Sequence, residues 1–471
     1  MASGTGLRRR EFLQHGAARS VALAASSGWM GHVLADPSES RRLDGASIPI
    51  HSGDIVSYSG TTSTASGRDV DLFLQEMRRR NFQYFLDAAD PVTGLIADRG
   101  RADGSFFSHA ASTAACGFGL AALSVSDDES LISRDEAHDR VVRMLDSLLH
   151  LAQHYSGFVY HFIDRRSGAR AYRSEASTID TALMLAGAMT AEMSFPDSSQ
   201  VTELCQRLCE RVQWRRMLSS SGVLHMGWKP GTGLLPQRWD RYSELTLMVL
   251  IAIGSQPNGI DPDCWHAWRR NDELTHRGEA FLSYPPLFVH QYPMAFFDFR
   301  GWRSPSGRDY WRNSVTAHAA QIDFMRGLAD RYPDRFSHYG SELWGLTSSD
   351  SVSGYRDWGG PYQDGRIEPD RGIDGTVVPS AAAGALAITG DAAVETLLHQ
   401  RDRYGDLVYG DYGFANAFNP ATGWVSPDVI GIDTGISYLM SENRRAESIW
   451  NAFMRHPTAE RAFQRVGFYR S

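Results

Sequence analysis

Three acidic residues, Asp180, Glu244 and Asp433, each stand at the start of a stretch that favours a helix. Paired carboxyl groups can cleave a glycosidic bond, because one carboxylic acid protonates the leaving oxygen while one carboxylate activates water. The ordinary alternative is capping, in which an acid in the first turn accepts hydrogen bonds from the free N–H groups and interacts favourably with the helix dipole. Ser177 and Asp180 form a pattern like a capping box.

The sequences after Asp180 and Glu244 indicate that these acids line a cavity and do not serve only as helix caps. Both stretches are apolar on nearly every side, which predicts buried helices. An acid in the first turn of a buried helix must lie at the wall of a cavity. We therefore expect the starts of several interior helices to bring these acids together.

Tryptophan and tyrosine gather in and beside the segments between the predicted helices. A flat apolar ring with a polar edge suits the C–H face and hydroxyl rim of a sugar, although aromatic side chains also fill protein cores. The surrounding Gly, Asp and Arg residues favour a surface site. The residues are Trp228, Trp239, Trp302, Trp311, Trp344, Trp358, Trp424, Tyr242, Tyr292, Tyr355, Tyr362, Tyr404, Tyr409 and Tyr412.

Helical periodicity dominates the chain from residue 69 onward. A capping box, Ser133 to Glu136, starts one helix, and Phe158 to Phe162 is the best short strand candidate. Long loops separate the helices, and such loops are usually functional. We expect one domain over 69–471. The other predicted helices cover 178–193, 198–214, 242–254, 310–331, 378–402 and 433–455, and the long loops cover 224–240, 284–308, 344–375 and 404–431.

Composition narrows the class of protein. The chain has 471 residues and a formal charge of −8, and a nucleic-acid partner would favour a basic excess. The most apolar internal run, Leu245 to Gly254, is much shorter than the ~20 residues that span a bilayer. The four cysteines, Cys116, Cys205, Cys209 and Cys264, are too few for a disulfide scaffold, so we expect buried free thiols.

The usual cofactor motifs are missing or lack their context. The chain has no P-loop, no G-x-S-x-G and no CxxC. Gly117 to Ala122 fits G-x-G-x-x-A, but the sequence before it favours a helix rather than a strand. His150 and His154 have zincin spacing without the glutamate. The sequence therefore predicts no cofactor and no metal at the site.

The first 35 residues have the layout of a twin-arginine secretory signal. Arg8 to Arg10 precede the pair Phe12-Leu13, a weakly apolar stretch follows, and Val33 to Ala35 form a small-residue cleavage pattern. The stretch 36–68 is rich in Ser, Thr and Gly and predicts a flexible linker. We expect a bacterial protein exported to the periplasm or beyond, with the twin-arginine machinery as a partner and no membrane span after cleavage.

Several segments together resemble the bacterial glycoamylase-like domain family, which includes endo-β-1,2-glucanases. They run in order over nearly the whole chain after the linker. The segments are AACGFGL at 114–120, STIDTAL at 177–183, MGWKP at 226–230, YSE at 242–244, FVHQY at 288–292, FDFRG at 297–301, YGSELWGLT at 339–347, PSAAAG at 379–384, YGF at 412–414, AFNP at 417–420 and GIDTG at 431–435.

The resemblance implies an all-α fold, an (α/α)6 toroid of inner and outer helices around a funnel, with few short strands. It implies hydrolysis of a glucan, best matched by endo cleavage of a β-1,2-glucan, with inversion. It places Asp180, Glu244 and Asp433 at the funnel. The chain departs from the family at Ser243, where Asn is frequent, at Thr434, where Gln is frequent, and at 441–445, where a tyrosine is expected. The predicted substrate contacts are His290, Gln291, Glu342 and Asp350 from the resemblance, with Tyr242, Trp344, Tyr412, Trp424 and Arg300 from the same segments and loops.

The roles of the acids remain open between two assignments. Glu244 is the expected general acid, and either Asp433 or Asp180 the general base. A helix N-terminus stabilises the ionised carboxylate, so an acid there needs burial or a nearby carboxylate to raise its pKa.

Two other functions fit the same scaffold. A polysaccharide lyase would use a base and cationic groups, which Tyr242, His290, Arg238 and Arg241 could supply. A glycan-binding protein without catalysis would keep the tryptophans but have no paired acids at a productive distance. A phosphorolytic enzyme would need a phosphate pocket, for which the sequence gives no clear signal.

Overall fold

Helices that are buried on every side form the inner ring of the structure. Every residue of α3 and α7 is buried, as expected for helices without a solvent face. The inner helices are α3 (Thr113–Ser124), α5 (Thr178–Ser194), α7 (Leu245–Gly254), α9 (Tyr292–Phe296), α12 (Pro379–Ala383) and α15 (Gly431–Ala446). The computed structural model describes residues 67–126, 131–361, 367, 369 and 372–471. The predicted signal at 1–35, and the linker up to residue 66, lie outside these residues.

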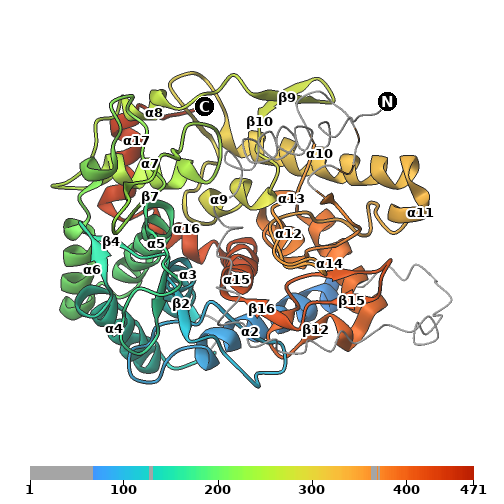
Figure 1. Ribbon diagram of the computed structural model, residues 1–471, viewed down its shortest axis with the longest axis horizontal. Helices are drawn as coiled ribbons and strands as arrows, with labels where there is room; N and C mark the ends of the chain where they lie inside the picture. The colour runs from blue at the N-terminus through green and yellow to red at the C-terminus, as the bar shows by residue number, and fades with distance from the viewer. Residues whose placement is uncertain (1–66, 127–130, 362–366, 368, 370–371) are drawn as a thin grey trace, which may run out of the picture.

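Contacts between successive inner helices close the ring. Helix α3 packs against α5, α5 against α7 and α7 against α9, while α15 contacts α9, α12 and α3. In Figure 1, α15 lies near the centre, with α3 and α5 on one side and α12 on the other. The all-α toroid expected from the sequence is confirmed.

The outer helices cover this ring and bury one face each. In α4, Val141, Met144, Leu145 and Leu148 are buried, and Ser133 caps the helix by accepting the Glu136 N–H at 3.2 Å, as predicted. The outer and short helices are α2 (Gly67–Asp87), α4 (Arg134–His150), α6 (Ser199–Arg211), α8 (Cys264–Ala267), α10 (Tyr310–Arg331), α11 (Pro333–Phe336), α13 (Leu386–Thr389), α14 (Asp391–Tyr404), α16 (Ser448–Phe453) and α17 (Pro457–Val466).

Several predicted elements differ in the structure, and the predicted loop 284–308 contains the inner helix α9. The helix expected over 378–402 is divided into α12, α13 and α14, and Gly390 between the last two has a φ of 61°. The helix expected over 433–455 breaks at Glu447, which has a φ of 56°. The strand expected from Phe158 to Phe162 is two separate strands, and α2 begins two residues inside the predicted linker.

Short antiparallel strands connect the helices. Three of them, β2, β6 and β16, run directly into α3, α5 and α15, so each pairing fixes where an inner helix begins. The pairs are β1 (Arg99–Arg101) with β16 (Asp428–Ile430), β2 (Ala110–Ser112) with β5 (Phe162–Asp164), β3 (His154–Tyr155) with β4 (Phe158–Val159), β9 (Glu273–His276) with β10 (Glu279–Leu282), β11 (Trp302–Arg303) with β17 (Tyr469–Arg470), β12 (Tyr409–Gly410) with β13 (Gly413–Phe414), β14 (Phe418–Asn419) with β15 (Trp424–Val425), and β6 (Ala176–Ser177) with β7 (Gly227–Lys229) and β8 (Gly233–Leu234).

Two glycines allow α3 and α5 to approach closely. A Cβ atom at Gly187 would lie 2.0 Å from the carbonyl oxygen of Gly117, and one at Gly117 would lie 2.3 Å from that of Leu183. Gly117 belongs to the G-x-G-x-x-A pattern, so this glycine serves helix packing. The four cysteines are unpaired, as predicted, and Cys116, Cys205 and Cys264 are buried.

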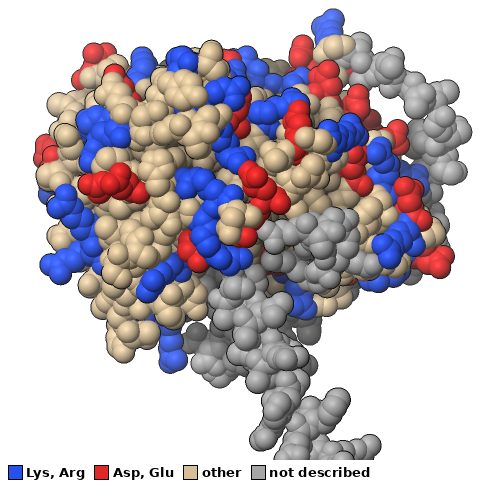
Figure 2. Space-filling view, turned by 90° about the horizontal axis from the view of Figure 1, so that it is seen from above, with Lys and Arg blue, Asp and Glu red and all other residues tan. Residues whose placement is uncertain are grey.

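The surface carries mixed charge on the face in Figure 2, where basic and acidic side chains alternate without forming one large field of either sign. In the described part of the chain, no helix combines the length and the apolar character needed to cross a bilayer.

Candidate active site

Asp180 and Glu244 line the same cavity, which we call the acidic cleft. It encloses about 810 Å³ of space, partly open to solvent. Its polar lining includes His161, Glu175, Asp180, Tyr242, Glu244 and Asp357. The starts of α5 and α7 thus place two of the three predicted acids in the lining of one cavity.

Asp433 lines an adjoining hollow, and Phe288 lines both spaces. Tyr292, also at this hollow, links the three acids electrostatically. Burial raises the pKa of the Tyr292 phenol, and the charges of Asp433, Glu244 and Asp180 raise it further. The three carboxyl groups therefore act on the same buried side chain from two adjoining spaces.

Strand pairing places two of the acids at equivalent positions. Strand β6 ends at Ser177 and β16 ends at Ile430, so Asp180 and Asp433 are each the third residue of the helix that follows. Ser177 caps α5 by accepting the Asp180 N–H, and its own hydroxyl donates to Asp180 Oδ2 at 2.5 Å. Asp180 therefore takes part in the helix cap and also lines the cleft.

Glu244 is a buried carboxyl group at the N-cap of α7, but its side chain makes no capping hydrogen bond. Burial raises the pKa of Glu244 to about 8, and the charges of Asp357 and Asp180 contribute. Desolvation and like charge therefore outweigh the helix N-terminus, which would favour the ionised form. At neutral pH this carboxyl group holds its proton.

Asp433 is buried but receives two hydrogen bonds. Asn416 Nδ2 donates to Oδ2 at 2.5 Å, and the Ser380 hydroxyl donates to Oδ1 at 3.1 Å. Burial raises the pKa of Asp433 to about 7, while these two donors oppose the rise. Because both partners donate, they stabilise the carboxylate form, and Asp433 is poised to gain or lose a proton near neutrality.

His161 lies between two carboxylates of the acidic cleft. Its Nδ1 is 3.1 Å from Glu175 Oε1, and its Nε2 is 3.7 Å from Asp180 Oδ1. Burial would lower the pKa of His161, but Asp180 and Glu175 outweigh it and raise the pKa to about 9. The imidazole is therefore a cation at neutral pH. Burial raises the pKa of Asp180, opposed by His161 and Ser177.

The atoms of His161, Glu175 and Asp180 are also close enough to hold a cation, within 4.8 Å of one another. Protonated His161 and Lys229, whose Nζ is 3.9 Å from Glu175 Oε2, already supply positive charge to these carboxylates. The arrangement fits an ion-pair network that holds Asp180 in place. Asp180 Oδ1 is buried and has no hydrogen-bond partner among the described residues, so the charge of His161 at 3.7 Å compensates it.

Sequence reasoning missed His161, Asp357 and Asn416. His161 lies in the predicted strand 158–162, yet nothing in an alternating pattern marks its pairing with Asp180. Asp357 lies in the long loop 344–375, and the position of that loop in the toroid brings it to Glu244. Asn416 precedes Asp433 by a whole hairpin, so only the fold reveals their contact.

Several predicted substrate contacts lie at or next to the site. Tyr242 lines the acidic cleft, and Gln291 lines the Asp433 hollow. Gln291 donates to the carbonyl of Ala381 at 2.7 Å, which holds its amide. Asp350 pairs with Arg99 at 3.0 Å and contributes to the raised pKa of Asp433.

His290 is a correction to the sequence-based prediction. Its side chain is fully buried, with Nδ1 3.0 Å from the Tyr242 hydroxyl and Nε2 3.0 Å from the Ser283 hydroxyl. Both ring nitrogens are engaged by the protein. His290 therefore holds Tyr242 from within the core and is not among the residues that line the acidic cleft.

Trp344, Arg300 and Glu342 are also placed differently from the prediction. Trp344 is fully buried in the hydrophobic core. Arg300 pairs with Asp298 at 2.8 Å and with Glu447 at 2.7 Å, at the end of α15 opposite to Asp433. The Glu342 side chain is 73% exposed and lies beside His399, because its segment turns outward before Trp344 enters the core.

Tyr412 and Trp424 lie apart from the two cavities described above. Tyr412 is buried, and its hydroxyl donates to Asp87 Oδ2 at 3.1 Å. Its ring packs edge-on against Tyr84 at 5.7 Å, so it belongs to an aromatic cluster. Trp424 is partly exposed in β15, within a hairpin with β14.

Comparisons with known proteins agree with this architecture. Residues 236–457 match the model of the Glycoamylase family, described as "Putative glucoamylase". A curated relative, the exo β-1,2-glucooligosaccharide sophorohydrolase (non-reducing end) of Parabacteroides distasonis, is 24% identical over 456 residues, which cover 88% of this chain and 60% of the relative. The chain thus spans about three fifths of that relative.

Two solved structures have the same fold. The endo-β-1,2-glucanase of Chitinophaga pinensis, in complex with sophorotriose and glucose, is 24% identical with a TM-score of 0.77, over 85% of this chain and 98% of that one. The β-1,2-glucanase of Parabacteroides distasonis is 24% identical with a TM-score of 0.74, over 84% of this chain and 60% of that one. The described toroid therefore has the fold of these glucanases, and its stretch 236–457 carries the sequence pattern of the Glycoamylase family.

Proposed function

We propose that this protein is a glycoside hydrolase that cleaves β-1,2-linked glucan by an inverting two-carboxylate mechanism. The observation that carries the proposal is that Glu244 and Asp180 line the acidic cleft while Asp433 lines the adjoining hollow, with Phe288 lining both spaces. Two relatives are named for action on β-1,2-glucooligosaccharides and β-1,2-glucan, which supports the substrate class.

Glu244 is the general acid. Its carboxyl group has a pKa raised to about 8 by burial, so it carries a proton at neutral pH. It can donate that proton to the glycosidic oxygen as the bond to the anomeric carbon breaks. The nearby charges of Asp357 and Asp180 then disfavour the resulting anion, which helps Glu244 to recover its proton.

Asp433 is the general base. Asn416 and Ser380 donate to both of its oxygens, which stabilises the ionised form. Its pKa of about 7 leaves a large fraction ionised at neutral pH, and a base works best when its pKa lies near the operating pH. Asp433 takes a proton from the water that attacks the anomeric carbon from the face opposite to the leaving group.

Asp180 orients the substrate. Asp180 lines the acidic cleft, its buried Oδ1 atom has no hydrogen-bond partner among the described residues, and His161 supplies a compensating positive charge at 3.7 Å. A sugar hydroxyl group in the cleft can donate to the Asp180 carboxylate. The interaction would fix the ring between Glu244 and the attacking water.

The test is release of reducing sugar from β-1,2-glucan compared with other bacterial and plant glucans. We expect selective release from β-1,2-glucan, loss of release in Glu244→Gln and Asp433→Asn, and initial products of α configuration by NMR. A product ladder indicates endo action, and a single disaccharide indicates exo action. Binding with no release from any glucan by the intact protein would overturn the proposal in favour of a glycan-binding protein.

A lyase is the competing reaction on this fold. Burial raises the pKa of the Tyr242 phenol and lowers that of His290, and His290 is sealed from the cleft. Tyr242 is therefore a poor base at neutral pH. Absorbance from a new C=C bond in the products would establish the lyase and defeat hydrolysis.

We also propose that the protein is exported by the twin-arginine route to the periplasm or beyond. The support is the order of Arg9-Arg10, the pair Phe12-Leu13 and the cleavage pattern that ends at Ala35. Replacing both arginines with lysine should retain the protein in the cytoplasm on cell fractionation. Unchanged export of that variant would contradict the route.

A further inference from the structure

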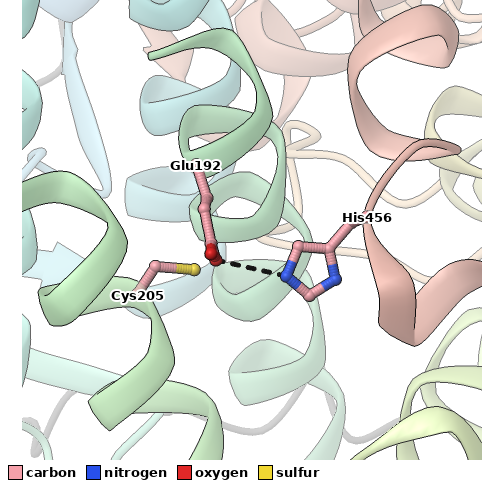
Figure 3. Close-up of side chains that lie close together, drawn as sticks. All are labelled: Glu192, Cys205 and His456. Carbon is pink, nitrogen blue, oxygen red and sulfur yellow. Dashed lines mark hydrogen bonds and ion pairs between the residues drawn. The ribbon is translucent and has the colours of Figure 1, made fainter. Parts of the chain in front are cut away.

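A second polar cluster lies in the interior, away from the acidic cleft. Glu192 in the last turn of α5, Cys205 in α6 and His456 just before α17 point toward one another (Figure 3). All three residues are buried. A carboxylate oxygen, the sulfur and a ring nitrogen lie within 4.8 Å of one another, with Glu192 Oε2 3.2 Å from His456 Nε2.

A fourth donor adjoins this cluster. Cys209 follows Cys205 by one helical turn on α6, so the two side chains lie on the same face of the helix. Cys209 is partly exposed, so it offers a route from solvent. Two sulfurs, one imidazole nitrogen and one carboxylate oxygen form a donor set that suits zinc, which prefers four tetrahedral N, S and O ligands.

We propose that Glu192, Cys205, Cys209 and His456 form a structural zinc site. On binding, each thiol releases one proton to solvent and each sulfur bonds Zn²⁺ as a thiolate. Two thiolates, one carboxylate and a neutral imidazole leave a net charge of −1 on the complex. Arg461, which interacts electrostatically with Cys209, offsets that charge.

His456 must change its hydrogen bonding when the metal binds. Its Nδ1 atom now accepts the Thr458 N–H at 3.2 Å and caps α17, so the proton of the neutral ring is on Nε2, facing Glu192. Coordination through Nε2 moves this proton to Nδ1, which then cannot accept from Thr458. One helix-cap hydrogen bond is weak compared with four bonds to zinc. The Thr458 amide should therefore exchange with solvent faster in the zinc-bound protein.

The site is structural because of its distance from the cleft. Glu192 and Asp180 are twelve residues apart on α5, which corresponds to about 18 Å along the helix axis. Zinc would instead join α5, α6 and the segment before α17, which come from distant parts of the sequence. This role is independent of the proposed hydrolase activity. The sequence showed no metal site because its ligands lie on three separate segments.

The test uses chelator-treated full-length protein titrated with Co²⁺ and then with Zn²⁺. We expect one equivalent of Co²⁺ with a thiolate-to-cobalt charge-transfer band, displacement by Zn²⁺, and a higher Tm with zinc. The band separates this site from His161, Glu175 and Asp180, which contain no sulfur. Cys205→Ser and His456→Gln should bind Zn²⁺ at least tenfold more weakly.

Cys264→Ser is the matched control, because Cys264 is also buried but lies outside the cluster, and it should bind metal like the unaltered protein. Cys209→Ser, at a partly exposed position, tests the site again if Cys205→Ser does not fold, and it should weaken binding and reduce the charge-transfer band. No thiolate band in the unaltered protein would overturn the proposal. Equal zinc affinity in the unaltered protein and the folded Cys209→Ser and His456→Gln variants would overturn it as well.

Discussion

The amide of Asn416 donates a 2.5 Å hydrogen bond to Oδ2 of Asp433. The same amide accepts the backbone N–H of Asp350 through its oxygen at 2.8 Å, so its orientation is fixed from both ends. The loop that carries Asp350 thereby holds the candidate base through Asn416. Asn416 acts as a positioning residue, because it acts through the Asp433 carboxylate to which it donates.

Asn416→Ala should shift the pH dependence of hydrolysis. The donor stabilises the Asp433 carboxylate, so its loss raises the pKa of Asp433 above about 7. The base then ionises only at higher pH, and the acidic limb of the kcat/KM profile should move upward. Asn419→Ala is the control, since Asn419 is a buried asparagine whose amide donates to the carbonyl of Asp374. An acidic limb that stays in place would contradict the role of Asn416.

Glu244→Gln should remove the general acid. We expect kcat on β-1,2-glucan to fall by roughly 10²–10⁴-fold, the usual contribution of a positioned acid. A substrate with an activated aryl leaving group needs no protonation, so its cleavage should fall far less. In the unaltered enzyme, activity should decline as the pH rises through about 8, where Glu244 loses its proton. Equal losses on both substrates would argue against an acid at this position.

The sequence predicts the positions of the acids better than their partners. Asp180 and Glu244 could be assigned to a cavity wall because the helices behind them are apolar on every side, and periodicity reveals that property directly. The pairing of His161 with Asp180 depends on a bridge between Tyr160 and Ala176, which sets the segment before β5 beside β6, a contact that no local pattern encodes. The same holds for Asn416 and Asp433.

Several predicted substrate contacts lie away from the described cavities, because residue type alone does not fix the direction of a side chain. Trp344 lies in a matching segment, but its ring turns into the core while the neighbouring Glu342 points outward. Arg300 lies close in sequence to Gln291, yet α9 carries the chain to the other end of the toroid between them. The sequence identifies candidate residues, but side-chain direction depends on how the helices pack.

His161→Gln should reduce stability in a pH-dependent way. The folded pKa of His161 is raised to about 9, above the ~6.5 of an unfolded chain. Its pairing therefore stabilises the fold fully below about pH 6.5, and the contribution is lost as the pH rises through about 9. The shift corresponds to on the order of 3 kcal/mol at most.

Denaturant unfolding of the two proteins at several pH values measures this effect. The difference in free energy of unfolding between the unaltered protein and His161→Gln should be largest near pH 6 and should shrink toward pH 9. His150→Gln is the control, because His150 is exposed on α4 beside Asp146 and should have little effect at any pH. A difference independent of pH would mean that His161 contributes by packing and not by charge.

Gly187→Ala should destabilise the toroid at the contact between α3 and α5. Helix propensity alone favours alanine by about 1 kcal/mol. A Cβ atom here, however, would lie 2.0 Å from the backbone oxygen of Gly117, and backbone atoms in two buried helices cannot move aside easily. We expect a net loss of about 1–3 kcal/mol in the free energy of unfolding, as for other overpacked cores.

Gly340→Ala is the matched control for this clash, because a Cβ atom at Gly340 would meet nothing within 4 Å. Its effect should stay within about 0.5 kcal/mol, as for other surface changes. Because α5 carries Asp180 at its start, separation of the two helices should also lower hydrolysis of β-1,2-glucan. If the Gly187→Ala protein is as stable as the Gly340→Ala protein, then α3 and α5 can separate without cost. That result would contradict the predicted clash between their backbones.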